Sequence, residues 1–275
     1  MTSNSLPTAT DSGQSFWDHL DALRAVLIRV VVVTVVTGLV AFLFKEELFA
    51  VVLAPKDAGF VTYRLLSGLG SLWGGEPFGS FEVQLINTGL AEQFLIHVKT
   101  AMCAGVLCAS PYILYQLFRF VSPALYAHER RYAVTAVCCG YAMFLSGVLL
   151  TYFLLFPLTF RFLGTYQVSR EVVNMISLSS YMSTLLVMCL SMGIVFEMPV
   201  LSWLFARLGL LSASFMRRYR RHAIVLILIV AAVITPTSDV FTLLVVACPM
   251  CLLYELSLSV VRRVNARRPY VQAEE

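Results

Sequence analysis

Six apolar runs, separated by segments that hold most of the charged residues, constrain this chain more than any other feature of its sequence. The chain has 275 residues, of which 59% are hydrophobic and 13% are charged. Soluble domains contain roughly 45–50% apolar and about 25% charged residues. A helix that crosses the bilayer core needs about 20 consecutive apolar residues, so this chain has room for several crossings and little else. The sequence therefore predicts an all-α integral membrane protein.

We predict six transmembrane helices in a single membrane domain over about residues 16–260. The predicted spans cover about 25–44, 94–118, 132–156, 181–205, 223–235 and 240–260. Residues 1–15 are polar and rich in Ser and Thr, which favours a disordered N-terminal tail. Residues 261–275 are predicted to be a cytoplasmic C-terminal tail.

The fifth and sixth predicted spans are expected to be short, and the bundle to be curved. The run 223–235 ends before Pro236 and would cover about 20 Å of a bilayer core that is roughly 30 Å thick. Proline removes a backbone donor and bends a helix. Prolines lie within or at the ends of several spans, at Pro111, Pro157, Pro199 and Pro249. These features predict a curved bundle with a concave face.

The basic residues predict the orientation in the membrane. Fourteen of the 20 Lys and Arg residues fall at one set of span ends. They are Arg24, Arg29, Arg119, Arg130, Arg131, Arg207, Arg217, Arg218, Arg220, Arg221, Arg262, Arg263, Arg267 and Arg268. Cytoplasmic loops carry an excess of Lys and Arg. We therefore expect both termini to be cytoplasmic.

Several function classes are disfavoured by the same sequence. The basic residues lie in short loops between spans, so we predict no nucleic-acid partner. The four histidines form no H-E-x-x-H motif and no nucleophile motif stands out, so we predict no enzyme activity. All seven cysteines fall in apolar stretches, where small-residue packing is the favoured interpretation, and we predict no metal and no cofactor.

One acid, Glu197, lies well inside the fourth predicted span. A charged group at the centre of a span costs about 2.5–3.5 kcal/mol on insertion scales, so such residues are rare. The functional interpretation makes Glu197 a polar contact for a substrate or partner. The structural interpretation makes it an acid bonded to a neighbouring helix. We favour the functional interpretation.

The loop "SPALYAHERRY", residues 122–132, contains one acid, Glu129, next to Arg130 and Arg131. An acid at the start of a helix is stabilised by the helix dipole, and the arginines would set the topology. Alternatively, the carboxylate is held to receive a guanidinium group, which carboxylates bind in a bidentate manner. The residue pattern by itself leaves both interpretations open.

The longer segment "SPYILYQLFRFVSPALYAHERR" resembles the first cytoplasmic loop of the TatC family, the polytopic receptor subunits of twin-arginine protein translocases. "FWDHLDALR" resembles the N-terminal helix of that family, and "LAPK" resembles its first outer-loop element. "FPLTFRFL", "FEMPV", "ITPTSDVFT" and "ACPMCLLYE" follow in the family's order. The resemblance covers about residues 16–260.

The resemblance implies that the chain recognises signal peptides with two consecutive arginines on folded cargo proteins. It implies that Glu129 contacts the arginine pair, with Tyr126, His128 and Arg130 as supporting loop residues. The family's second acid falls at the position of Ala22, which is a departure from the family pattern. Asp21 and Asp18 are the candidate replacements, because Asp21 is adjacent and Asp18 lies on nearly the same helix face.

The resemblance also implies a set of intramembrane and outer-side residues. Glu197, Pro55 and Asp239 would belong to the translocation-competent state, and Thr242 with Glu197 would dock partner helices. The implied partners are single-span TatA- and TatB-like subunits within an oligomeric complex in the bilayer of the bacterial inner membrane, driven by the proton gradient. The alternative function is that of a secondary transporter for a small solute, although the sequence shows no convincing internal duplication.

Overall fold

The computed structural model describes residues 16–72, 84–121, 133–167, 169, 174–235 and 239–271. These residues form long helices, as the apolar runs predict, and one two-residue strand pair. The long elements are α1 (Phe16–Leu43), α4 (Glu92–Val121), α5 (Ala133–Leu150), α7 (Leu178–Val195), α10 (Arg220–Ile234) and α11 (Val240–Val271). The shorter helices are α2 (Lys45–Leu53), η1 (Ala54–Lys56), α3 (Val61–Leu72), η4 (Thr151–Leu155), α6 (Phe156–Thr165), α8 (Met198–Arg207) and α9 (Ala213–Arg218). The strands β1 (Leu85–Ile86) and β2 (Ile176–Ser177) pair in parallel.

Five helical stretches in the described residues are long and apolar enough to cross a membrane. They are Leu20–Leu43, Glu92–Phe120, Val134–Thr165, Leu178–Arg207 and Val240–Ala266. The predicted short run 223–235 lies in α10, a helix of 15 residues that is about 22 Å long. Each predicted apolar run is therefore helical. Helix α10 falls short of the length of an ordinary span, as expected, but the sixth predicted span does not, because its apolar stretch Val240–Ala266 has 27 residues. The prediction that the sixth span is short is therefore wrong.

The third stretch extends beyond its predicted end at residue 156. Pro157 lies inside this continuous helical stretch, where its missing N–H removes a backbone donor. Local π-helical adjustments accommodate such a proline in a membrane helix. The preceding turn, η4, is a π-helix. In addition, the segment between the first two predicted spans, residues 45–92, contains α2, η1 and α3.

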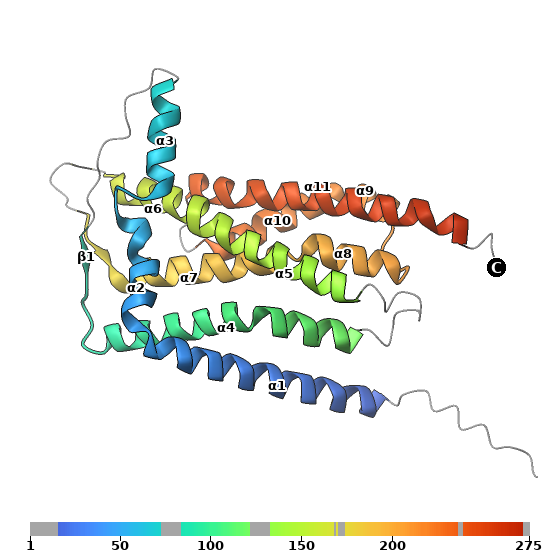
Figure 1. The fold of residues 1–275 in the computed structure, drawn as a ribbon. Helices are drawn as coiled ribbons and strands as arrows, with labels where there is room; N and C mark the ends of the chain where they lie inside the picture. The colour runs from blue at the N-terminus through green and yellow to red at the C-terminus, as the bar shows by residue number, and fades with distance from the viewer. Residues whose placement is uncertain are drawn as a thin grey trace, which may run out of the picture.

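The described elements have two distinct ends, which are visible in Figure 1. One end holds α2, α3, α6, β1 and β2, and we call it the cap end. The other end holds the start of α1, the end of α4, the start of α5, α9 and the end of α11, and we call it the terminal end. The start of α1 and the end of α11, where the described residues begin and end, both lie at the terminal end.

Tyrosine hydroxyls fasten the cap end to the long helices. The Tyr63 hydroxyl lies 3.1 Å from the carbonyl oxygens of both Pro55 and Pro157. The Tyr181 hydroxyl donates to the carbonyl of Val52 over 3.0 Å. Burial raises the pKa of Tyr63 above its ordinary value, so this hydroxyl keeps its proton and remains a donor. The segment after α1 is thus held in a defined position over α6 and α7.

Small residues bring helix backbones close together at two places. A Cβ atom on Gly105 of α4 would lie only 2.6 Å from the backbone of Gly38 on α1. The Thr37 hydroxyl donates across this contact to the carbonyl of Gly105 over 3.0 Å. A Cβ atom on Gly147 of α5 would lie 2.7 Å from the carbonyl of Met192 on α7. Close backbone approach through small residues is typical of helix packing in membranes.

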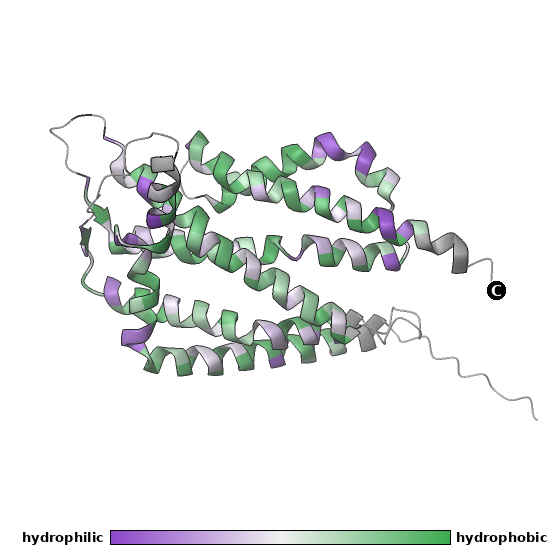
Figure 2. Cartoon of the chain, turned by 45° about the horizontal axis from the view of Figure 1, so that its top comes forward, coloured by the Kyte–Doolittle hydropathy of each residue, from purple (hydrophilic) through white to green (hydrophobic). Residues whose placement is uncertain are grey.

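The outer surface of the bundle is apolar over the middle of the long helices. Figure 2 shows hydrophobic colours along most of their length, with hydrophilic colours concentrated near the two ends. Helix α1 packs along α4 and leaves most of its remaining surface exposed, with Leu39 at 62% and Leu43 at 79%. An exposed apolar surface of this kind suits contact with lipid. The central core lies between α4, α5, η4, α6, α7, α10 and α11.

Candidate functional site

Glu197 lies at the break between α7 and α8 and is buried, with 8% of its surface exposed. Its carboxylate faces α5, since a Cβ atom placed on Gly140 would lie 3.1 Å from Glu197 Oε2. Within the described residues, Glu197 Oε1 has no hydrogen-bond partner. An unsatisfied buried carboxylate oxygen costs free energy. The structural interpretation, an acid bonded to a neighbouring helix, therefore finds no donor among the described residues.

The local sequence explains why the chain bends at this acid. Pro199 lies in the first turn of α8 and cannot continue the hydrogen bonding of α7. Glu197 is the residue that caps α8, but its side chain makes no capping bond. The bend thus directs the carboxylate toward Gly140 instead of its own helix.

Asp239 and Thr242 lie at the start of α11, at the cap end. Asp239 Oδ1 accepts from the backbone N–H of Thr242 over 2.7 Å and so caps the helix. Thr242 is fully buried, and its hydroxyl has no hydrogen-bond partner among the described residues. Thr242 is thus a second buried polar group that this part of the chain leaves unsatisfied.

Pro55 lies in η1 at the cap end and is buried. Its carbonyl accepts from the Tyr63 hydroxyl, so its position is fixed against α3 and α6. The structure does not bring Pro55, Glu197 and Thr242 into one cluster. Pro55 lies in η1 and Thr242 lies at the start of α11, both at the cap end. Glu197 lies at the α7–α8 bend.

The predicted arginine-binding acids fall partly outside the described residues. Glu129, Tyr126, His128 and Arg130 lie in the segment between α4 and α5, which is not described. Asp21 and Ala22 lie near the start of α1 and are exposed. Asp18 lies in the first turn of α1, and its side chain is not described.

The ends that flank this undescribed segment are informative. Val121, the last residue of α4, and Ala133, the first of α5, both lie at the terminal end. The start of α1, with Asp18 and Asp21, lies at the same end, and α1 packs along α4. The first-helix acids and both ends of the loop therefore share one end of the bundle.

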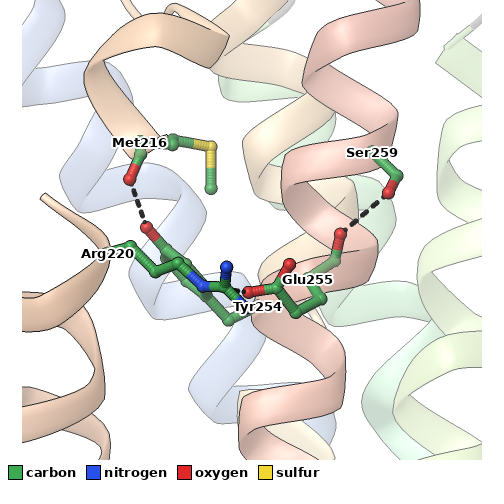
Figure 3. A network of polar contacts seen from close by, with 5 residues as sticks. All are labelled: Met216, Arg220, Tyr254, Glu255 and Ser259. Atoms are coloured by element: carbon green, nitrogen blue, oxygen red, sulfur yellow. Dashed lines mark hydrogen bonds and ion pairs between the residues drawn. The ribbon is translucent and has the colours of Figure 1, made fainter. Parts of the chain in front are cut away.

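The other intramembrane acid, Glu255, has a partner. Figure 3 shows the Arg220 side chain reaching Glu255, with 2.7 Å between Arg220 Nε and Glu255 Oε1. Both side chains are about half exposed. The neighbouring Tyr254 hydroxyl donates to the carbonyl of Met216 over 2.7 Å. Glu255 thus belongs to a contact between α10 and α11 at the terminal end.

Two residues near these sites were missed by the sequence analysis. Gly140 leaves the space that the Glu197 carboxylate occupies, and only the pairing of α5 with the α7–α8 bend shows this role. Gln116 is buried near the terminal end of α4, where its Nε2 donates to the Tyr112 hydroxyl over 2.6 Å. A glutamine within an apolar run is a signal that could have identified the second residue.

Taken together, these features define a class of protein. Long apolar helices with exposed apolar surfaces form a multi-pass membrane protein, and its buried Glu197 and Thr242 lack partners among the described residues. In lipid, such polar groups are suited to bonds with another helix or ligand.

Comparison with known proteins gives the family. The family model for "Sec-independent protein translocase protein (TatC)" matches residues 18–249, and the chain belongs to this family. It is 33% identical over 258 residues to the TatC protein of Blattabacterium sp. subsp. Periplaneta americana, covering 92% of this chain and 97% of that protein. It is 34% identical over 252 residues to the TatC protein of Deinococcus radiodurans, covering 91% and 87%.

A solved structure supports the same assignment. The crystal structure of the twin-arginine translocase receptor TatC superposes with a TM-score of 0.73 at 29% sequence identity. The match covers 90% of this chain and 99% of that chain. The protein is therefore a membrane-embedded component of the twin-arginine, Sec-independent translocation system and not an enzyme. The resemblance noted in the sequence is confirmed.

Proposed function

We propose that this chain is the receptor subunit that binds the Arg-Arg signal peptide of folded cargo, and that it does so at the terminal end. The observation that carries this proposal is the shared location of the first-helix acids and both ends of the α4–α5 segment. Glu129 lies within that segment. A cluster of carboxylates at one end of the bundle is suited to two adjacent guanidinium groups.

Glu129 is the central acid of this proposed site. A carboxylate binds a guanidinium through two parallel charge-assisted hydrogen bonds, which an ammonium group does not reproduce. Asp21, which is exposed on α1, or Asp18 supplies the second carboxylate in place of Ala22. Tyr126, His128 and Arg130 are the proposed supporting residues of the loop that contains Glu129.

The proposed orientation has six crossings, with both termini in the cytoplasm of a bacterium and the chain in its inner membrane. The shared location of the start of α1 and the end of α11 supports an even number of crossings. The exposed apolar side chains of α10 support its being the additional crossing, with Leu226 at 61% and Val233 at 78% exposed. A helix of about 22 Å crosses only where the bilayer is locally thinned.

Glu197 and Thr242 are the proposed contacts for the single-span TatA- and TatB-like partners of an oligomeric complex. Both groups are buried and lack hydrogen-bond partners in the described residues, so a polar side chain of a partner helix satisfies them only after the helices around them separate. Pro55 and Asp239 act on the outer side by fixing the η1 turn and the start of α11. The transmembrane proton gradient drives transport.

Peptide binding tests the receptor role. The full chain in lipid nanodiscs is titrated with a labelled signal peptide that carries Arg-Arg and with a matched Lys-Lys peptide. We expect the Lys-Lys peptide and the Glu129→Gln variant each to weaken binding by about tenfold or more, because bonds to charged groups are worth about 1.5–3 kcal/mol. Asp21→Asn and Asp18→Asn, measured separately, identify the second acid.

The chain offers a gain-of-function control at Ala22. Ala22→Glu restores an acid at the family's position and is expected to strengthen binding of the Arg-Arg peptide severalfold, with a smaller gain for the Lys-Lys peptide, which gains the charge attraction but not the bidentate bonds. Equal affinity for the two peptides, or unchanged affinity in Glu129→Gln, contradicts the proposed site.

A further inference from the structure

The segment between α8 and α10, residues 208–219, lies at the terminal end, and local sequence signals fix its conformation. We call this segment, together with the first turn of α10, the shelf. Gly209, with φ of 81°, ends α8, and the N–H of Leu210 donates to the carbonyl of Phe205 over 2.9 Å. Ser212 then caps α9 by accepting from the N–H of Phe215 over 3.2 Å. These two local signals determine where α9 begins.

One face of α9 is attached to α11. Met216 is buried in a small cluster with Ala206, Val261 and Val264. Its carbonyl also accepts from the Tyr254 hydroxyl. This face is therefore covered by the chain itself.

The opposite face of α9 has no such cover and combines aromatic with basic side chains. Phe215 and Tyr219 are 55% and 42% exposed, and their rings lie 4.7 Å apart. Arg217, Arg218 and Arg221 are exposed and form no ion pair within the described part of the chain. The adjacent Arg220, by contrast, forms an ion pair with the carboxylate of Glu255.

Helix stability does not explain these charges. Arg220 and Arg221 occupy the first turn of α10, which contains no acidic residue. The N-terminus of a helix carries a partial positive charge, so a cation there is unfavourable by about 0.3–1 kcal/mol. A bound anion would offset this repulsion.

The surroundings indicate which anion this shelf binds. The next turns of α10 expose apolar side chains, among them Val225 at 56% and Leu226 at 61%. Aromatic side chains beside such a surface are typical of the headgroup level of a bilayer. Guanidinium groups bind phosphate in a bidentate manner. We propose that Arg217, Arg218 and Arg221, with Phe215 and Tyr219, form a binding site for the phosphate of an anionic phospholipid. This site is independent of signal-peptide binding.

The short α10 gives this site a structural purpose. Because α10 is only about 22 Å long, the lipid headgroups lie at the level of its first turn where the bilayer is locally thinned. In a bilayer of ordinary thickness, the headgroup region would extend past the arginines. A phosphate held by α9 and the start of α10 keeps the membrane surface at this level. The site therefore anchors the short helix at the terminal end.

Lipid binding by the purified, delipidated full chain tests the site. The chain in detergent is titrated with phosphatidylglycerol or phosphatidylcholine of identical acyl chains, and bound lipid is counted by native mass spectrometry. We expect phosphatidylglycerol to bind preferentially. In the variant Arg217→Gln/Arg218→Gln/Arg221→Gln, its affinity should fall by about tenfold.

A matched control separates a site from general charge. The variant Arg24→Gln/Arg29→Gln/Arg119→Gln removes the same charge from three exposed arginines on α1 and α4. It should keep its phosphatidylglycerol affinity within about twofold. Equal losses in the two triple variants, or equal binding of the two lipids, would overturn the assignment.

The triple Arg-to-Lys variant at 217, 218 and 221 keeps the charge and removes the guanidinium fork. Its affinity should lie between those of the wild-type chain and the Gln variant. A Lys variant that binds as tightly as the wild type would overturn the bidentate site. Thermal unfolding of each variant in detergent confirms that a lost affinity does not result from loss of the fold.

Discussion

The two acids within long apolar helices, Glu197 and Glu255, have similar sequence settings and different structural environments. Glu197 is buried at the α7–α8 bend, and one carboxylate oxygen has no partner in the described residues. Glu255 is about half exposed and pairs with Arg220 over 2.7 Å. The comparison teaches that hydropathy identifies an unusual acid, whereas only its neighbours show whether the fold already uses it.

Two buried hydroxyl groups on α11 repeat this difference. Ser257 donates to the carbonyl of Leu253 over 2.8 Å and is therefore satisfied within its own helix. Thr242 is equally buried, but its hydroxyl has no partner among the described residues. Glu197 and Thr242 thus have hydrogen-bonding groups without a partner in the described residues, while Glu255 and Ser257 each have a partner.

The largest expected effect tests Glu197. Glu197→Leu should lower transport of a twin-arginine cargo by about tenfold or more, since the partner contact is lost. The free energy of unfolding should rise by about 1 kcal/mol, because a buried unsatisfied group is removed. Cargo export by cells and denaturation of the purified chain in detergent measure the two quantities.

A substitution that keeps the polar group serves as the control at this position. Glu197→Gln retains hydrogen-bonding groups and should export cargo better than Glu197→Leu. A loss of stability in Glu197→Leu would show that the carboxylate supports the fold, and the contrast with Glu255 would then fail.

A smaller effect is expected at Gly140, which lies against the Glu197 carboxylate. Gly140→Ala places a Cβ atom 3.1 Å from Oε2, and the carboxylate must move to make room. Transport should fall by about fivefold, equivalent to about 1 kcal/mol of disturbed packing. The matched control is Gly68→Ala on α3, where an added Cβ meets no atom within 4 Å. Comparable losses in the two variants would contradict a role for the Gly140 space.

Thr242 and Ser257 provide a third test, with a smaller expected difference. Thr242→Val should reduce transport about twofold to threefold, which corresponds to about 0.6 kcal/mol for one hydrogen bond between helices in lipid. Ser257→Ala should leave transport unchanged, because Ser257 bonds only within α11. Crosslinking of single-span partners to the start of α11 checks whether the loss arises from docking.

The smallest effect is expected for the exposed pair at the terminal end. In a double-mutant cycle with Glu255→Gln and Arg220→Gln, the coupling free energy should be below about 1 kcal/mol, because both groups are about half exposed. Unfolding of the four purified proteins gives this coupling. A coupling free energy of several kcal/mol would show that the Glu255–Arg220 pair contributes strongly to the stability of the fold, which would contradict the contrast with Glu197.

The sequence predicted much of the fold because its main signal is local. Each of the six apolar runs is helical, and Pro199 marks the start of α8 as proline chemistry requires. The segment between α1 and α4 was predicted less well. Its helices α2 and α3 are held by two hydrogen bonds between residues far apart in the sequence. The Tyr63 hydroxyl of α3 donates to the carbonyl of Pro157, and the Tyr181 hydroxyl donates to the carbonyl of Val52 in α2. Local sequence patterns do not encode such pairings.

The candidate site divides in the same way. Glu197 was singled out from sequence, because a charge within an apolar run is costly wherever it lies. Its neighbour Gly140 was missed, since a glycine in a helix has many uses and only the packing of α5 against the α7–α8 bend selects this one. Glu129 stays a prediction from resemblance.

By itself, the amino-acid sequence determined that this chain is a membrane helix bundle, because runs of apolar side chains leave no other way to satisfy the backbone in lipid. It also determined where helices start and stop, through proline, glycine and capping serine residues. Only the tertiary structure decided which polar groups are satisfied, because a hydrogen bond between helices depends on distances that residues far apart in the sequence set together. For this reason only the tertiary structure distinguishes Glu197 and Thr242, which have groups without hydrogen-bond partners in the described residues, from Glu255 and Ser257, which have partners.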